Sequence, residues 1–468
     1  MKRLKKKHIA GGVITVSLLT GTLALFNSTN IFDFESAPTD VAAQAPDVKQ
    51  VFVDSLTIQK DPDVVYNRED ILNDYENRVS ESFKIPDNLR DRVGFWFDIY
   101  TQHNSNKRLI HHSLYPWIVF EVVDVTPIIE ADLPKHRWMR NLKADEFVKQ
   151  EVEKAKTALK SLSKRKHFES LTPDEAMIAD ALNKLDGDNL AKKAKVALQN
   201  IRVQTGQKDH FHEGLEVSPQ YLPGMEEIFQ QAKLPVELTR IPFVESSFNK
   251  HAQSKVGASG IWQFMGGTGR KFMIVDQHID ERNSPFKASV AAAQLLKENH
   301  MILKKSWPLA ITAWNHGPPG MRKAMAAAKS HDLGEIVGKY RSRSFDFASS
   351  NFYSEFLAAL FAERYHTQIF KDLQYEDTLD LHTVKLARSI GAKELVRLSG
   401  LSNENFLHFN PDLKKAIDAN MSVPSGFTLM LDNGARAVLK NLIAKETPSK
   451  KRKLSKNDIS LSSPIARE

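Results

Sequence analysis

The chain has 468 residues, of which 41% are hydrophobic, and its 65 lysines and arginines exceed its 57 aspartates and glutamates. This length is more than one compact domain usually holds, and a net charge of +8 is too mild to indicate a nucleic-acid partner, although it suits an anionic cell-surface polymer or a membrane face. The absence of cysteine excludes disulfides, thiolate catalysis, cysteine-bound zinc and a lipid attached through an N-terminal cysteine.

The N-terminus predicts export. Residues 1–8 are basic, and the 18 residues of Ile9–Phe26 are uncharged and mostly apolar. Residues 1–26 are therefore predicted to be either a signal peptide, with Ala43-Gln44-Ala45 resembling a cleavage site, or an uncleaved anchor in the inner membrane. Both alternatives place the rest of the chain in the periplasm or the cell envelope. Residues 27–59, rich in Ser, Thr, Pro, Asp and Ala, are predicted to be a linker.

Helical patterns dominate afterwards, so the predicted fold class is mainly α, with residues 60–214 as a helical N-terminal region. Apolar residues recur every three or four positions over 144–162, and Thr172-Pro-Asp-Glu175 has the form of a capping box with proline in the first turn. The stretch 110–125, rich in β-branched and aromatic residues, is the best strand candidate. A charged insertion at 134–208 is predicted to be either plain scaffold or a partner-binding or regulatory helical arm.

The second half of the chain predicts more helices and then a change of character. Helices are expected at 225–232 and, in alanine- and leucine-rich sequence that allows close packing, at 289–296 and 309–313. Residues 376–432 contain short apolar runs and turn signals, and they are predicted to be a small α+β appendage. Residues 445–468 are basic and poor in apolar residues, so we expect a disordered tail.

Glu245 stands out because it is the only acidic residue in the stretch 241–264 and directly follows an apolar run. Pro242 cannot continue a helix from the preceding residues, so the backbone is expected to kink or end there and to leave Glu245 at a helix terminus. Burial among apolar side chains raises the pKa of a carboxyl group, which then stays protonated near neutral pH and can donate to a leaving oxygen. The alternative is a surface residue that forms a salt bridge with Arg240.

Aromatic and amide side chains follow Glu245 at two places. Trp262-Gln263-Phe264 and Trp314-Asn315 each set an aromatic ring beside an amide, and Gly257 and Gly260 permit a tight loop before the first of them. Sugar rings stack on aromatic side chains, while Asn and Gln match hydroxyl and acetamido groups. The combination suits a neutral, polyhydroxylated substrate.

Three stretches in order resemble the motifs of lysozyme-like lytic transglycosylases. Glu245-Ser246, Gly260-Ile-Trp-Gln263 and Ala313-Trp-Asn315 stand where that family has Glu-Ser, Gly-Leu-Met-Gln and Ala-Tyr-Asn. The approach over residues 221–238 is similar to the membrane-bound murein transglycosylase D subgroup. The resemblance covers about a third of the chain.

The resemblance implies a lysozyme-like α-helical catalytic domain over residues 215–370. It implies cleavage of the MurNAc–GlcNAc bond of peptidoglycan without water, in which the MurNAc 6-hydroxyl attacks its own anomeric carbon and leaves a 1,6-anhydro end. The partner is then the peptidoglycan glycan strand, and no cofactor is needed. The implied acid/base is Glu245, and the implied substrate-binding residues are Ser246, Ser254, Gln263, Trp314, Asn315 and Tyr353.

The sequence departs from the family in two places. Trp314 replaces the usual Tyr of the third motif, and Gly266-Gly267 replaces the usual Pro-Ser before Thr268, and both changes bear on fine specificity. Further on, the segments 401–411 and 423–431 look like the second half of a LysM glycan-binding module. The Gly-Asp-Thr-Leu opening of that module is missing.

Counting acids favours the anhydro-forming reaction over hydrolysis. No second acid lies close in sequence to the motifs, since Asp276, Asp280 and Glu281 fall in a polar connector and are interpreted as structural. An ordinary glycosidase needs two carboxyl groups. The alternatives are a muramidase, which would require a second carboxylate, and a non-catalytic wall-binding scaffold, which would tolerate loss of Glu245. His210-Phe-His212 has the form of a metal pair without further ligands in register, so no metal site is predicted.

Overall fold

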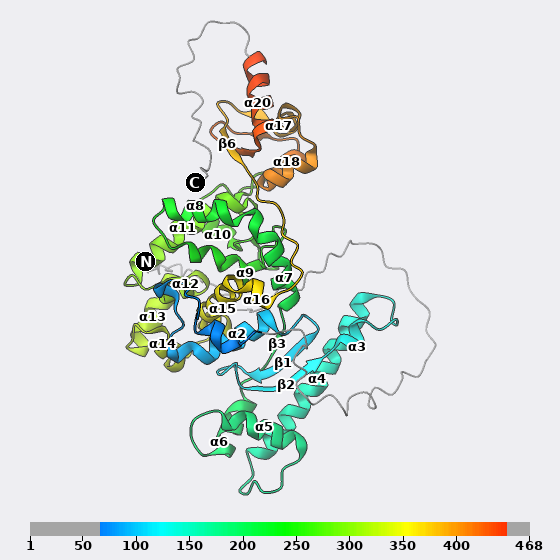
Figure 1. The fold of residues 1–468 in the computed structure, drawn as a ribbon, viewed down its shortest axis with the longest axis vertical. Coiled ribbons are helices and arrows are strands. Elements are labelled where there is room, and N and C mark those ends of the chain that lie inside the picture. The colour runs from blue at the N-terminus through cyan, green and yellow to red at the C-terminus, as the bar shows by residue number, and fades with distance from the viewer. Residues whose placement is uncertain (1–65, 447–468) are drawn as a thin grey trace, which may run out of the picture.

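The computed structural model describes residues 66–446, with residues 441–446 as backbone only (Figure 1). Helices make up most of its regular structure, and the prediction of a mainly α protein is confirmed. No helix in this part of the chain is long and apolar enough to cross a membrane. The predictions for residues 1–26, for the linker at 27–59 and for the tail beyond 446 concern residues outside the described range.

The main helical body is built around α15 (Phe347–Arg364), most of whose residues are buried. This helix packs against α2 (Arg90–Thr101), α9 (Ile241–Ser246) and α12 (Trp307–His316). Its sequence is apolar or small nearly all round, which is typical of a helix surrounded by others. The body also contains α1 (Arg68–Leu72), α7 (Lys208–Val217), α8 (Leu222–Gln231), α10 (Gly266–Gly269), α11 (Pro285–Ile302), α13 (Pro318–Ala328), α14 (Leu333–Lys339), α16 (His366–Ile369) and a ribbon of β4 (Ala258–Ser259) and β5 (Phe264–Met265).

The helices predicted in the second half are present. Those expected at 225–232, 289–296 and 309–313 correspond to α8, α11 and α12, and the last two extend beyond the predicted ends on both sides. The small side chains of α11 and α12 lie in the core, where they allow the two helices to pack against each other.

A three-stranded antiparallel sheet of order β2-β1-β3 lies beside the body. Strands β1 (Lys107–His112) and β2 (Val119–Asp124) confirm the strand prediction for 110–125. Strand β3 (Ile201–Thr205) was not predicted, because five residues with only partial alternation give a weak signal. The predicted helical N-terminal region therefore also contains a sheet.

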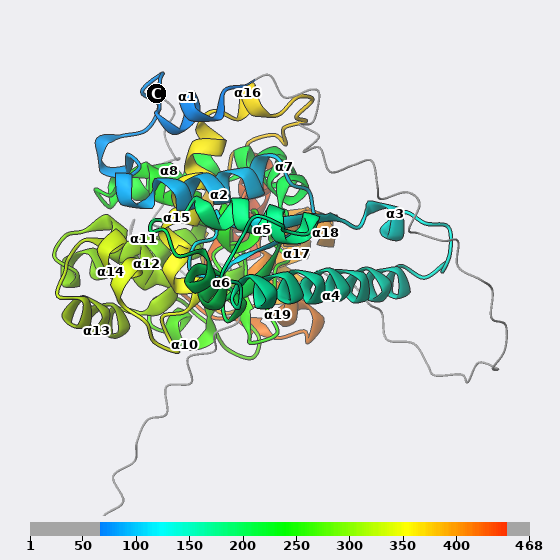
Figure 2. The ribbon, with the colours of Figure 1, turned by 90° about the horizontal axis from the view of Figure 1, so that it is seen from below.

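Between β2 and β3 the chain leaves the sheet as a helical arm of α3 (Thr126–Ile129), α4 (Arg137–Leu162), α5 (Pro173–Asn183) and α6 (Leu190–Leu198). The arm and one face of the sheet share a hydrophobic core of their own. The predicted face of α4 is largely buried, and the capping box at Thr172 and Glu175 is formed, with hydrogen bonds in both directions. Figure 2 shows α4 running outward from the body, with α3 near its far end.

Helix α2 belongs to the main body rather than to the arm. Its buried side chains join the same core as α9, α12 and α15. Two of them, Arg92 and Trp96, donate hydrogen bonds to Asn351 Oδ1 on α15, at 2.8 and 3.1 Å. The N-terminal half thus helps to build the helical body, a role that its sequence did not indicate.

The C-terminal unit confirms the prediction of a small α+β appendage. Two short ribbons, β6 (His382–Lys385) with β9 (Thr428–Leu431) and β7 (Ile390–Gly391) with β8 (Ser422–Val423), pack with α17 (Ala392–Ser399), α18 (Asn403–Phe409), α19 (Lys414–Asp418) and α20 (Asn433–Glu446). Helix α20 adds Ala435 and Leu439 to the core, so the unit extends past the predicted end at 432. Lys287 of α11 joins it to the body, with Nζ 2.6 Å from Asp412 Oδ2 and 3.6 Å from the ring centre of Phe427.

Candidate active site

Glu245 lies in the last turn of a very short helix. Helix α9 begins at Ile241, directly after a 3₁₀ turn at Val236–Arg240, and carries Pro242 in its first turn. The helix ends at Ser246, and Ser247 adopts the left-handed conformation with φ 48°. The predicted break beside Pro242 is therefore confirmed, and it leaves Glu245 at a helix end, partly accessible from outside.

The Glu245 carboxyl group has one hydrogen-bond partner among the described residues, the indole of Trp314 on α12. The Trp314 Nε1–H donates to Glu245 Oε1 at 2.8 Å. Burial raises the pKa of Glu245 to about 8, although the indole hydrogen bond opposes the shift by favouring the ionised form. The raised pKa thus favours the protonated form of Glu245 at neutral pH. The rings of Trp262 and Phe264 hold the indole in place, with centroids 5.5 and 5.0 Å away.

The alternative of a salt bridge between Glu245 and Arg240 is wrong. The Arg240 guanidinium is buried and pairs with Glu363 of α15 at 2.9 Å, and with Glu226 of α8. We call these three residues the Arg240 cluster. Both acids come from other helices. Arg240, five residues before Glu245, is therefore already paired with Glu363 and Glu226 and forms no salt bridge with Glu245.

The loop after α9 turns back toward the helix, as its glycines predicted. Gly260 has φ 75°, and a side chain there would meet the carbonyl oxygen of Arg282 at 1.9 Å, so only glycine fits. Gln263 Nε2 donates to the carbonyl oxygens of Gly260 at 2.8 Å and Ala252 at 3.1 Å. Ser246 Oγ donates to the carbonyl of Ile261 at 2.8 Å and joins the returning chain to α9.

The other predicted substrate-binding residues differ in where the structure places them. Ser254 Oγ accepts a hydrogen bond from the Ala258 N–H at 2.9 Å within the loop and makes none with Glu245. Asn315 is exposed, and its Oδ1 accepts from Ser349 at 2.7 Å. Tyr353 is 2% exposed and makes no hydrogen bond with Glu245 in the described structure. Of the six, Trp314 alone contacts the Glu245 carboxyl group through a hydrogen bond.

A second carboxyl group lies near Glu245, and the sequence analysis missed it. Burial, together with the negative charge of Glu245, raises the pKa of Glu355 on α15 to about 8, against the opposing charge of Arg202. Glu355 is partly accessible and forms no hydrogen bond or ion pair with any described residue. A signal was available, because Glu355 is an acid within a largely apolar helix, whose other acid, Glu363, lies near the helix end.

Helix α2 contributes a phenol to the same place. Burial, followed by the negative charges of Glu355 and Glu245, raises the pKa of Tyr100. The tyrosine whose pKa is raised by the charge of Glu245 is thus Tyr100, which comes from the N-terminal half of the chain. We call Glu245, Trp314, Glu355 and Tyr100 the Glu245 cluster.

Acids in the polar connector after the second motif have structural partners. Asp276 Oδ1 accepts from two backbone N–H groups at 2.8 Å, Asp280 pairs with Arg282 at 2.7 Å, and Glu281 pairs with Lys287 at 3.1 Å. None of them is the second acid that a hydrolase would require.

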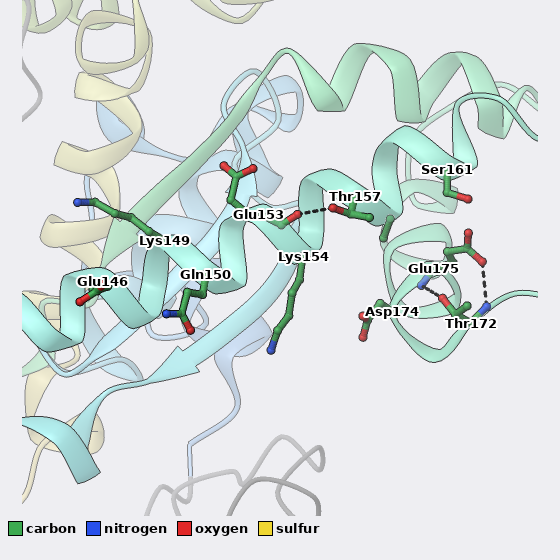
Figure 3. Close-up of a pocket in the computed structure, with 11 residues that line it drawn as sticks. Glu146, Lys149, Gln150, Glu153, Lys154, Thr157, Ser161, Thr172, Asp174 and Glu175 are labelled. Carbon is green, nitrogen blue, oxygen red and sulfur yellow. Dashed lines mark hydrogen bonds between the residues drawn. The ribbon is translucent and has the colours of Figure 1, made fainter. Parts of the chain in front are cut away.

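A hollow of about 830 Å³ lies elsewhere, on the arm between α4 and α5 (Figure 3). Its lining mixes cations and anions, including Lys149, Lys154, Glu153 and Asp174. Glu175 at its end is occupied by the capping box and by Arg165, at 2.6 Å. The hollow therefore offers charged scaffold surface without a convergent catalytic set. No group of three or more His, Asp or Glu side chains suited to a metal ion is present among residues 66–446.

Comparisons with known proteins point to the same region. Residues 226–336 match the family model of the transglycosylase SLT domain. Membrane-bound lytic murein transglycosylase D of Escherichia coli K12 is 26% identical over 167 residues, which cover 34% of this chain and 35% of that protein. A putative tributyltin chloride resistance protein of an Alteromonas species is 29% identical over 102 residues, covering 22% of this chain and 49% of that one.

A solved structure, the 70 kDa soluble lytic transglycosylase of Escherichia coli, aligns over 65% of this chain and 56% of its own, with 16% identity and a TM-score of 0.27. The chain spans about a third of the length of the transglycosylase D that it matches. The matched segment of the SLT model contains Glu245, the returning loop and Trp314. Residues 226–336 of the chain therefore match the transglycosylase SLT domain, and the chain is similar to membrane-bound lytic murein transglycosylase D over a third of its length.

Proposed function

We propose that this chain is a peptidoglycan lytic transglycosylase whose acid/base is Glu245. The observation that carries the proposal is the state of this carboxyl group. It lies at a helix end, has no cation paired with it, accepts a hydrogen bond from Trp314 and has its pKa raised to about 8. A carboxyl group that is protonated at neutral pH and partly accessible is suited to donate to the oxygen of a glycosidic bond.

The reaction needs one proton carrier and no water. Glu245 donates its proton to the glycosidic oxygen while the bond from that oxygen to the MurNAc anomeric carbon breaks. The acetamido group of the substrate stabilises the positive charge at that carbon. The ionised Glu245 then takes the proton of the MurNAc 6-hydroxyl as its oxygen bonds to the anomeric carbon. The acid is restored, and the product carries a 1,6-anhydro ring.

The other site residues divide into those that bind substrate and those that shape the site. Trp314 orients the Glu245 carboxyl group through its indole N–H, and its half-buried ring is available to contact a sugar. Asn315 is exposed and keeps its amide N–H groups for hydroxyl or acetamido oxygens, since its Oδ1 already accepts from Ser349. The side chains of Ser246, Ser254 and Gln263 hold the loop through the hydrogen bonds described above. Tyr353 is buried in the core of the helical body.

Hydrolysis by a muramidase is the second candidate, and Glu355 is the observation that favours it. A hydrolase needs two carboxyl groups about 5 to 9.5 Å apart, one of which activates water or attacks the sugar. Glu355 lies close enough to Glu245 to feel its charge. Its pKa of about 8 speaks against this role, because a protonated carboxyl group at neutral pH is a poor base.

The substrate sets the location and partners that we propose. Peptidoglycan lies outside the cytoplasm, so the basic and apolar N-terminal residues would direct export, either as a signal peptide or as an anchor in the inner membrane through residues 9–26. The C-terminal unit, with its likeness to half of a LysM module, is proposed to contact the glycan strand beyond the cleavage site. Nucleic acid is not a proposed partner.

Release of soluble fragments from purified peptidoglycan tests the proposal. The parent chain is expected to release them, and Glu245→Gln is expected to abolish release while keeping the fold. Glu335→Gln is the matched control, because Glu335 is exposed and pairs with Lys339 at the surface. Equal release by the parent and by Glu245→Gln would exclude Glu245 as the acid/base, and no release by the parent would favour the scaffold alternative.

A further inference from the structure

The arm ends in a surface that the catalytic proposal does not use. Three large apolar side chains are exposed there, namely Leu133 at 71%, Trp138 at 56% and Leu142 at 58%. Trp138 and Leu142 are four residues apart in α4 and so lie on one face of the helix. The first buried residue of α4 is Ala144, so this end of the helix lies beyond the core that holds the rest of the arm. We call residues 131–143 the arm tip.

The arm tip is also cationic. The stretch contains four cations and a single acid, Asp132. The cations are Lys135, Arg137, Arg140 and Lys143. None of the four forms an ion pair with any residue of the described structure. The second half of α4 differs, because Lys154 pairs with Glu151 at 2.8 Å and Lys156 with Glu153 at 2.6 Å. The cations of the tip are therefore not part of the network of ion pairs along the helix.

The tip is a built surface rather than a frayed end. Arg140 donates hydrogen bonds from Nη1 to the carbonyl oxygens of Pro134 and Lys135, both at 3.1 Å, and so fixes the preceding loop against α4. Positive charge at the start of a helix is unfavourable to the helix itself. Helix stability thus does not explain four cations at this position.

We propose that the arm tip docks on an anionic lipid surface. Exposed Trp and Leu beside Lys and Arg are typical of segments that lie in a membrane interface, where the rings and alkyl groups enter the acyl boundary and the cations meet the headgroups. A soluble polyanion such as a wall polymer would be bound by the cations but would leave Leu133, Trp138 and Leu142 exposed. The arm projects from the body (Figure 2), so the tip can reach a surface without burying the SLT domain. This inference does not depend on the proposed catalysis.

The absence of cysteine gives a direct test in the full chain. Leu142→Cys is labelled with an environment-sensitive fluorophore and mixed with vesicles of phosphatidylglycerol and phosphatidylcholine, with vesicles of phosphatidylcholine alone, and with purified peptidoglycan. We expect a blue shift, and quenching by brominated lipid, on the anionic vesicles alone. Val196→Cys, at an exposed apolar position on α6 of the same arm, is the control that should not respond.

A charge variant in the labelled background tests the electrostatic part. Replacing Lys135, Arg137 and Lys143 by Gln, while keeping Arg140 for the loop, should raise the lipid concentration needed for the response by on the order of a hundredfold. If the protein binds anionic vesicles but the fluorophore at Leu142→Cys shows no blue shift and no quenching, the proposal is overturned. An equal response on neutral vesicles, a response to peptidoglycan alone, or an unchanged response in the charge variant would also overturn it.

Discussion

The Arg240 cluster and the Glu245 cluster share helix α15 and the segment 240–245, yet they hold their carboxyl groups in opposite states. Glu363 and Glu355 both belong to α15, and Arg240 and Glu245 are neighbours along the chain. Burial alone would raise the pKa of Glu363, but the charge and hydrogen bonds of Arg240 outweigh it and lower that pKa. No cation among residues 66–440 lies at hydrogen-bond distance from Glu245 or Glu355, and the pKa of each rises to about 8.

The difference teaches that burial does not by itself decide the charge of a carboxyl group in this protein. What decides it is whether a cation has been placed against it. The Arg240 cluster stabilises the fold by joining α8, α15 and the segment before α9. In the Glu245 cluster, burial raises the pKa of two partly accessible acids and so favours their protonated forms, a pattern that is typical of catalytic sites.

The largest expected effect comes from replacing the carboxyl group of Glu245 with an amide. Glu245→Gln keeps the shape of the side chain but cannot donate and then accept a proton, so activity on peptidoglycan should fall by roughly 10²–10⁴-fold. Because the raised pKa makes the folded state hold its proton while the unfolded state ionises, the parent loses stability as pH rises from about 4.5 toward about 8. Glu245→Gln should therefore melt at a higher temperature than the parent at pH 8 and at a similar temperature at pH 4. Activity within tenfold of the parent would remove Glu245 from the mechanism.

The Arg240 cluster should respond in stability rather than in chemistry. Arg240→Leu leaves Glu226 and Glu363 without their common cation, and breaking a buried pair in this way costs about 3–5 kcal/mol. Denaturant unfolding at pH 7 measures the loss. As pH falls and Glu363 becomes protonated, the gap to the parent should narrow, because Arg240 is the main cause of the lowered pKa of Glu363. A variant as stable as the parent would show that the cluster does not hold the helices together.

A smaller effect is expected from the neighbour of Glu245. Glu355→Gln should leave the alkaline limb of the activity profile in place, because burial rather than Glu355 raises the pKa of Glu245, whereas the charge of Glu245 raises the pKa of Glu355. At pH 6, where both acids are protonated in the parent, activity should stay within about tenfold. A loss of a hundredfold or more at pH 6 would instead make Glu355 a reacting group and favour the muramidase.

The smallest effect comes from the indole hydrogen bond. Trp314→Phe keeps an aromatic ring against Trp262 and Phe264 but removes the N–H that favours the ionised form of Glu245. The alkaline limb should therefore move up, by roughly half to one pH unit, since one unit corresponds to about 1.4 kcal/mol and a hydrogen bond contributes about that much. If the limb does not move, the hydrogen bond at 2.8 Å has no influence on the acid.

The sequence predicted the features that depend on local chemistry. The break at Pro242, the capping box at Thr172 and the glycine-dependent turn at Gly260 all follow from backbone rules that act within a few residues. The solitary position of Glu245 in an apolar run indicated its raised pKa.

The features that sequence missed depend on distant packing. Glu355 and Tyr100 approach Glu245 only because α15 lies between α2 and α9, and no spacing rule relates those helices. Helix α15 contains two acids in largely apolar sequence, Glu355 and Glu363, and the sequence does not show which of them a cation neutralises. The short strand β3 pairs with β1, although all the residues of the arm separate the two strands in the sequence. The register of β3 is likewise set by tertiary structure.

Digestion of purified peptidoglycan in ¹⁸O-labelled water tests the central claim most directly, because it asks whether one acid acts without water. Mass spectrometry of the released fragments should find 1,6-anhydro-MurNAc ends that carry no label. Incorporation of ¹⁸O at the newly formed MurNAc end, with no anhydro product, would contradict the account and identify the enzyme as a muramidase that uses both Glu245 and Glu355.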